Sequence, residues 1–138
     1  MPKLLYTLST SDCSDNTLLA QFDNTVRAAL SVILSVDLSD DQWAQASLPV
    51  RNGGLGIRSA QMLAPSAFLA SAASTLELQQ SILPPSIQTL ADKSTESVEL
   101  SWAALSGASK PTGKQSCIQK AWDGLVSASQ MTRIRAVD

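Results

Sequence analysis

Apolar residues recur at steps of three and four between Asp15 and Val36. Such steps place side chains on one side of an α-helix, and Ser14 or Asp15 can accept hydrogen bonds from the first free backbone N–H groups. The pattern predicts an amphipathic helix whose apolar side faces the core. The residues that make up this side are Leu18, Leu19, Phe22, Val26, Ala29, Leu30, Ile33 and Leu34.

Two shorter helices are expected on either side of this segment. Pro2 favours a helical entry, so 2–8 is expected to form a short helical segment. Ser39 and Gln42 have the spacing of a capping box, in which each side chain bonds the other residue's backbone N–H. A short helix is therefore expected from Ser39 to about Ser47, with Asp40 and Asp41 in its first turn.

The second half of the chain also has helical periodicity, interrupted by breakers. Helices are expected over 59–82, 86–90, 95–106 and 113–127, followed by a final helical stretch with Met131, Ile134 and Val137. Pro65 should end or kink the first turns of the 59–82 segment, because it lacks an N–H group. Gly107 should stop the helix over 95–106.

A glycine-rich segment at 51–56 predicts the sharpest turn of the chain. Its glycine content, with Gly53, Gly54 and Gly56, resembles that of a phosphate-binding loop. It lacks the spacing of a dinucleotide-binding fingerprint and the Gly-Lys-Ser/Thr ending of a P-loop. We interpret it as a structural turn, with a weak anion site between Arg51 and Arg58 as the alternative.

Composition supports a single all-α domain. The chain has 138 residues, of which 44% are hydrophobic and 4% aromatic, enough apolar material for one core and too few sheet-forming residues for a β fold. We expect a compact bundle of about five to seven helices over 1–138. The loop over 107–112 is the best candidate for a hinge between the segments 1–106 and 113–138.

Catalytic chemistry has little support in the sequence. There is no histidine, so the usual general base and commonest metal ligand are missing. Asp40-Asp41 resembles a two-metal pair, but helix capping explains it better. Cys13 and Cys117 are expected as free thiols, with a long-range disulfide as the alternative. We expect neither enzymatic activity nor a metal or cofactor.

No stretch has the roughly 18 apolar residues that a membrane span requires, and no signal peptide is present. The sequence thus favours a soluble intracellular protein, cytoplasmic or nuclear, that makes no membrane contact.

Charge is unevenly distributed around a net value of −2. Residues 1–50 are acidic, whereas 110–138 are basic, and any polyanion contact belongs there. A solvated helix face is the alternative explanation of the basic residues. The three tryptophans, Trp43, Trp102 and Trp122, are interpreted as core anchors rather than base-stacking residues. The candidate nucleic-acid-binding residues are Arg51, Arg58, Lys110, Lys114, Lys120, Arg133 and Arg135.

Several motifs resemble the reverse transcriptases of non-LTR, LINE-type retrotransposons. Their order and separation also fit that family. The Gly-Gly-Leu-Gly-Ile block with its flanks is the most specific of these matches, and together they span nearly the whole chain. The motifs are Pro2-Lys3-Leu4-Leu5-Tyr6, the segment Leu48-Pro49-Val50-Arg51-Asn52-Gly53-Gly54-Leu55-Gly56-Ile57, its continuation over 63–72, Lys114-Gln115 and Ala121-Trp122-Asp123.

The resemblance implies a thumb and connector region that follows the polymerase palm and holds the template-primer duplex. The family's aromatic-Ala-Asp-Asp motif has no counterpart, and the zinc knuckle and endonuclease are also missing. The chain is then either a piece of a longer polyprotein or an open reading frame descended from a broken element.

Two functions follow as hypotheses. The first is a structural or interaction module that pairs with a second copy or a host protein, because loss of the palm would expose apolar surface. The second is a module that binds an RNA or DNA duplex through the basic C-terminal helices. We favour the first for the isolated chain.

Overall fold

A computed structural model describes residues 2–88 and 92–137, and its regular elements are all helical. The prediction of an all-α bundle is confirmed. The helices are α1 (Pro2–Thr10), α2 (Thr17–Leu34), α3 (Asp40–Ala46), α4 (Ala60–Ile82), α5 (Pro85–Gln88), α6 (Lys93–Ser106) and α7 (Gln119–Val137), and the short 3₁₀ helices are η1 (Val50–Asn52) and η2 (Gly113–Cys117).

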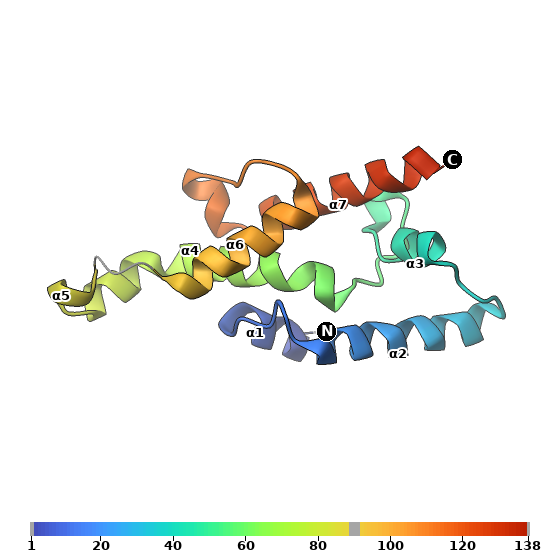
Figure 1. Cartoon of the computed structure of the whole chain (residues 1–138), viewed down its shortest axis with the longest axis horizontal. Helices are drawn as coiled ribbons and strands as arrows, with labels where there is room; N and C mark the ends of the chain where they lie inside the picture. Colours follow the sequence, from blue (N-terminus) through green and yellow to red (C-terminus); the bar gives the residue numbers. More distant parts are fainter. Residues whose placement is uncertain (1, 89–91, 138) are drawn as a thin grey trace.

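The long helix α4 lies at the centre of the molecule (Figure 1). It packs against α1 and α2 on one side and against α6, η2 and α7 on the other. Small residues at its buried positions, Ala60, Ala64, Ala67 and Ala70, let its neighbours approach closely. The central role of α4 thus depends on the alanine-rich first half of this helix.

Two apolar clusters occupy these two sides of α4. Leu8 of α1 and Leu19 of α2 pack against the alanines on one side. On the other side, Val98, Trp102, Trp122 and Val126 join Leu69 of α4. The core is therefore shared between α4 and its neighbours.

The helix α4 continues through Pro65, so of the two predicted outcomes, an end or a kink, the end is wrong. Pro65 lies in the second turn, so its missing N–H group removes one hydrogen bond close to the end of the helix. Its ring is fully buried, and this packing offsets the lost bond.

The predicted helix over 15–36 forms with slightly different ends. Asn16 caps α2, because its side-chain oxygen accepts a hydrogen bond of 2.9 Å from the Leu18 N–H. Ser14 instead donates to the carboxylate of Asp12, so the proposed caps Ser14 and Asp15 are wrong. Ser35 ends the helix with φ of 55°, in the left-handed region.

The predicted capping box is confirmed at the start of α3. The Ser39 hydroxyl accepts from the Gln42 N–H at 3.2 Å, and the Gln42 side chain accepts from the Ser39 N–H at 2.9 Å. Asp40 and Asp41 lie in the first turn of this helix. They occupy the position that the macrodipole favours for carboxylates.

The glycine-rich segment folds back onto the end of α3. The N–H groups of Gly54, Leu55 and Gly56 donate to backbone carbonyls at 2.9–3.2 Å, so they are not free to bind phosphate. A Cβ at Gly54 would lie 2.1 Å from the Leu48 carbonyl oxygen, and Gly53 has a φ of 83°. The interpretation as a structural turn is confirmed.

The helix predicted over 113–127 and the final helical stretch predicted after it are not observed as two separate α-helices. Residues 113–117 are a 3₁₀ helix, and one continuous α7 runs from Gln119 to Val137. Gly107 ends α6 as predicted, with φ of 61°. The helix expected over 86–90 appears as α5, and residues 89–91 lie outside the described part of the chain.

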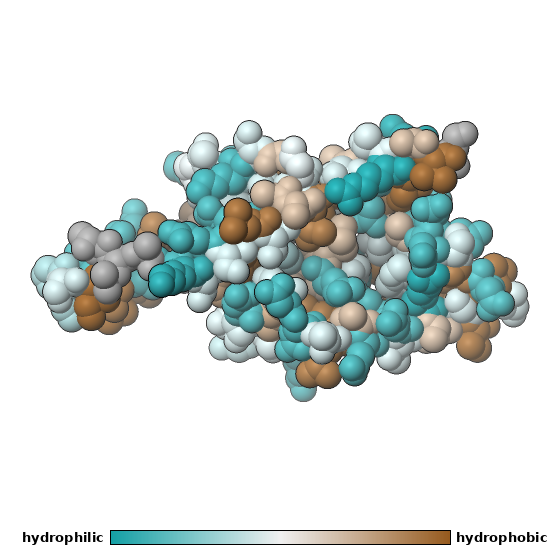
Figure 2. Space-filling view, in the orientation of Figure 1, coloured by the Kyte–Doolittle hydropathy of each residue, from teal (hydrophilic) through white to brown (hydrophobic). Residues whose placement is uncertain are grey.

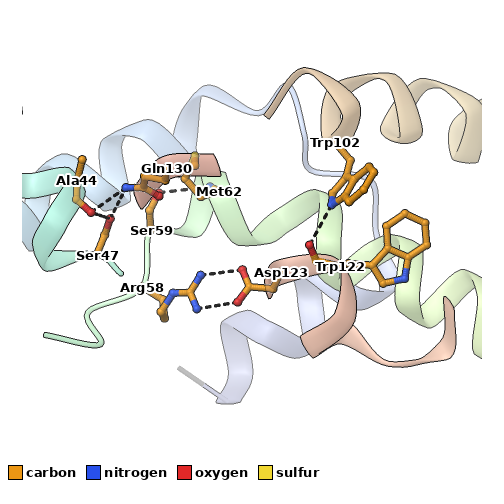
Figure 3. Close-up of polar contacts among 9 residues, drawn as sticks. All are labelled: Ala44, Ser47, Arg58, Ser59, Met62, Trp102, Trp122, Asp123 and Gln130. Atoms are coloured by element: carbon orange, nitrogen blue, oxygen red, sulfur yellow. Dashed lines mark hydrogen bonds and ion pairs between the residues drawn. The ribbon is translucent and has the colours of Figure 1, made fainter. Parts of the chain in front are cut away.

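The tryptophans join α6 to α7. The rings of Trp102 and Trp122 are buried and meet edge to face, with centroids 5.0 Å apart. The Trp102 indole donates to the Trp122 carbonyl at 3.3 Å (Figure 3). These two residues are core anchors as predicted, and Trp43 is half-buried. The pair holds together the helices on either side of the 107–112 loop.

A buried carboxylate joins α2 to the start of α4. Asp23 is only 4% exposed and accepts hydrogen bonds from the Ser59 hydroxyl at 2.6 Å and from the Ala60 and Gln61 N–H groups at 2.7 and 3.2 Å. The Ser59 oxygen accepts in turn from the Met62 N–H (Figure 3). The free N–H groups that begin α4 are thus satisfied by another helix.

We expect Asp23→Ala to lower the free energy of unfolding by about 2–4 kcal/mol, because it leaves buried donors without an acceptor. Urea denaturation followed by far-UV circular dichroism measures this. The control is Asp15→Ala, because Asp15 is an exposed carboxylate in the loop before α2. This substitution should change stability by less than about 0.5 kcal/mol. Equal effects of the two substitutions would contradict a capping role for Asp23.

Candidate functional site

The structure pairs two of the seven candidate nucleic-acid-binding residues with carboxylates, one pair largely buried and one at the surface. Arg58 makes two parallel bonds of 2.7 Å to the Asp123 carboxylate, and both side chains are largely buried (Figure 3). Lys110 contacts both carboxylate oxygens of Glu99, at 3.0 and 3.1 Å. Arg58 and Lys110 therefore have structural partners that sequence reasoning did not identify.

The other five candidates are exposed and lie on several elements. Arg51 is in η1, Lys114 in η2, and the remainder in α7. At about 100° per residue, Lys120 and Arg135 lie within roughly 60° of each other around α7, but about 22 Å apart along it. Arg133 points roughly 160° away from Arg135. The cations of α7 therefore do not converge on one face.

The other chemistry-bearing residues have structural roles or stand alone. Arg27 binds the Asp40 carboxylate at 2.7 Å and also donates to the Leu38 carbonyl. Within the described ranges, no group of three potential metal ligands comes together. Cys13 and Cys117 are free thiols, as predicted.

In the part of the chain that the structure describes, no helix is long and apolar enough to cross a membrane.

A groove of about 460 Å³ lies between α4, α6 and the 110–113 loop. The residues that line it include Leu76, Trp122, the carboxylates Asp92, Glu96 and Glu99, and the cation Lys110. The Thr95 hydroxyl and the nearby N–H groups of α6 lower the pKa of Asp92, so this carboxylate is charged at neutral pH. Carboxylates outnumber the lysine among the lining residues, so the groove does not extend a basic surface.

An exposed apolar surface lies along one side of α2. Placed at about 100° per residue, the largely apolar positions of this helix span an arc of roughly 200°. One side of the arc, with Leu19 and Leu30, is buried. On the other side, Leu18 is 62% exposed, Val32 79% and Ile33 77%.

This exposure corrects part of the sequence prediction. Five residues that were expected to face the core are exposed, namely Leu18, Phe22, Ala29, Ile33 and Leu34. The reason is geometric, because α2 packs mainly against α4 and one neighbouring helix cannot cover such a wide arc. We call Leu18, Phe22, Thr25, Ala29, Val32 and Ile33 the outer face of α2.

The outer face of α2 is continuous and carries no charge. Its residues Leu18, Phe22, Thr25, Ala29 and Val32 follow one another at alternating steps of four and three, the spacing of a coiled-coil seam. α2 forms the lower edge of the molecule in Figure 1, and hydrophobic residues gather over its C-terminal end in Figure 2. Such a surface is suited to packing against another helix.

We expect the Arg58–Asp123 pair to act in folding. Arg58→Ala should lower the free energy of unfolding by about 3 kcal/mol, because it leaves Asp123 buried without a partner. The double substitution Arg58→Met with Asp123→Leu should recover most of this loss, because it removes both charges. Urea denaturation of the natural protein, Arg58→Ala and the double variant provides the measurement. If Arg58→Ala leaves stability unchanged, the pair has no structural role.

The same placement predicts weakly salt-dependent binding to a nucleic-acid duplex. Contact through Lys120 and Arg135 would neutralise about two phosphates, so the logarithm of the binding constant should fall with a slope of about −2 against the logarithm of salt concentration. All seven candidates acting together would give a slope near −6. Fluorescence anisotropy with a labelled primer-template duplex distinguishes the two, and the steeper slope would contradict the separated arrangement.

Comparison with known proteins finds no relative of this chain. Family models, curated proteins and solved structures were compared with the chain, and none matches. The resemblance to the thumb and connector region of non-LTR reverse transcriptases therefore stays a prediction from the motifs around the 48–57 turn. The outer face of α2 is a candidate site on its geometry alone.

Proposed function

We propose that this chain is a non-catalytic protein-interaction module that associates with itself through the outer face of α2. The observation that carries the proposal is the exposure of large apolar side chains along one continuous helix face. Val32 and Ile33 are both more than three-quarters exposed. Contiguous apolar surface of this kind is typical of interaction sites.

The energetic reason is the removal of these side chains from water. Fully burying one large aliphatic side chain contributes roughly 1.5–3 kcal/mol. In the monomer, Leu18, Val32 and Ile33 remain mostly exposed. Much of this stabilisation is therefore gained only when a partner buries them. A partner helix seated on α2 would recover it without loss of charge solvation, because the outer face has no charged residue.

Descent from a retrotransposon reverse transcriptase is compatible with this role and is also a proposal. In the parent enzyme the palm would cover part of the thumb surface. Any part of that surface that no palm covers would be available to a second copy. The absence of histidine from the sequence supports a non-catalytic role, since it removes the commonest general base.

Duplex binding is the alternative proposal, based on the seven basic candidate residues. Two of those seven residues, Arg58 and Lys110, contact carboxylates. The five others are spread over η1, η2 and two sides of α7. This arrangement supports the interaction module more strongly than the nucleic-acid module.

Ile33→Lys should shift the protein from dimer to monomer in sedimentation velocity across a concentration series. The matched control is Ile82→Lys, because Ile82 is similarly exposed at 73% and also lies in the last turn of its helix. A lysine in the last turn is favourable to both helices. Both variants should retain the helical circular dichroism spectrum of the natural protein.

A dimer that is lost in Ile33→Lys and kept in Ile82→Lys supports the proposal. A natural chain that is monomeric at all concentrations contradicts self-association. Loss of the dimer in Ile82→Lys alone would place the interface at the far end of α4 and overturn the assignment to α2.

A further inference from the structure

We infer that the partner of the outer face of α2 is the same face of a second copy, turned end for end, with the two-fold axis passing between Thr25 and Ala29. This inference rests on the proposed function, because it specifies how the proposed self-association is built. In this arrangement Phe22 of each copy contacts Val32 of the other. Thr25 likewise contacts Ala29, so every central position of the face finds a counterpart.

The spacing of the face makes this pairing self-complementary. Phe22, Thr25, Ala29 and Val32 are separated by steps of three, four and three, and this series reads the same in both directions. Two copies aligned antiparallel about position 27 therefore place each of these residues opposite another member of the set. A two-fold axis requires this property, since one patch must fit itself.

The sizes of the side chains favour the antiparallel direction. Antiparallel pairing puts the large Phe22 opposite the smaller Val32 at both ends and joins Thr25 to Ala29 in the middle. Parallel pairing would put two phenylalanines in one layer and two alanines in another. A contact that combines large with small residues keeps the helix separation even and leaves fewer voids.

Electrostatics favours the same direction. Opposed macrodipoles attract, whereas parallel ones repel. The outer face has no charged side chain, so a second copy meets no like charge there. On one border of the face, Gln21 and Ala28 are exposed and uncharged, which allows the helices to approach without burying an ion.

The size of the surface predicts a reversible dimer. Stable specific interfaces bury about 800 Å² on each partner. The 18-residue α2 is about 27 Å long and about 10–12 Å across, so one face covers roughly 300 Å², which is less than this area. We therefore expect a dimer that dissociates as the protein is diluted through the micromolar range.

A charge-pair cycle tests the direction and register. Phe22→Glu and Val32→Lys should each weaken the dimer at least tenfold. Their combination in one chain places Glu opposite Lys twice across the axis. Its dimer should therefore be about threefold to tenfold tighter than the product of the single effects predicts. Sedimentation equilibrium gives the dissociation constants, and high salt should remove the gain.

The matched control is Phe22→Glu with Ile82→Lys, which carries the same added charges but places the lysine at the end of α4. It should show no gain. If Phe22→Glu with Val32→Lys is no tighter than the product, as expected for a parallel pair, the inferred register is overturned. A natural dimer sensitive to Ile33→Lys would then still support the proposed function, whereas a monomeric natural chain would overturn both.

Disulfide trapping gives a second measurement that avoids charged substitutions at the partly buried Phe22. In a Cys13→Ala, Cys117→Ser background, Phe22→Cys and Val32→Cys proteins are mixed and oxidised. Antiparallel pairing predicts a disulfide between the two different proteins. Links between identical copies should be rare, because their cysteines would lie about 15 Å apart along the helix. Dominant links between identical copies would overturn the inference.

Discussion

The Asp23 carboxylate of α2 caps the N-terminus of α4, and the arrangement of the helices depends on this contact. It accepts from the hydroxyl of Ser59 and the N–H groups of Ala60 and Gln61. The adjacent Arg58 binds Asp123 of α7. Four consecutive residues, 58–61, thus connect α2 and α7 to the central helix. Because these bonds are buried, an alternative packing of α2 would leave unsatisfied donors in the core.

Local rules were sufficient to predict most helix positions. The capping box at Ser39 and the helix end at Gly107 depend on residues close in sequence, so both could be predicted from the sequence. The tryptophan anchors also followed from apolar periodicity. Pro65 was misjudged because its cost is local, while the burial that offsets it comes from the tertiary structure. In the same way, the 3₁₀ turn of η2 could not be separated from α7 by periodicity.

Long-range polar contacts could not be predicted from periodicity. Arg58 and Lys110 were assigned to a basic surface because their charge is visible in the sequence, whereas their partners Asp123 and Glu99 are 65 and 11 residues away. An apolar arc also does not specify how much of it a neighbour will cover. One signal was present in the sequence, since the apolar arc of α2 is wider than a single packing contact requires.

The anchor explains why α2 exposes this particular face. An apolar arc of roughly 200° fits against α4 in several rotations with similar burial, so the hydrophobic effect alone would not choose between them. Asp23 can satisfy the start of α4 in one rotation, which turns Leu19 and Leu30 inward. Leu18, Phe22 and Val32 then point outward together. The directional polar contact thus determines which part of a non-directional surface remains for a partner, and it holds that face in a fixed orientation.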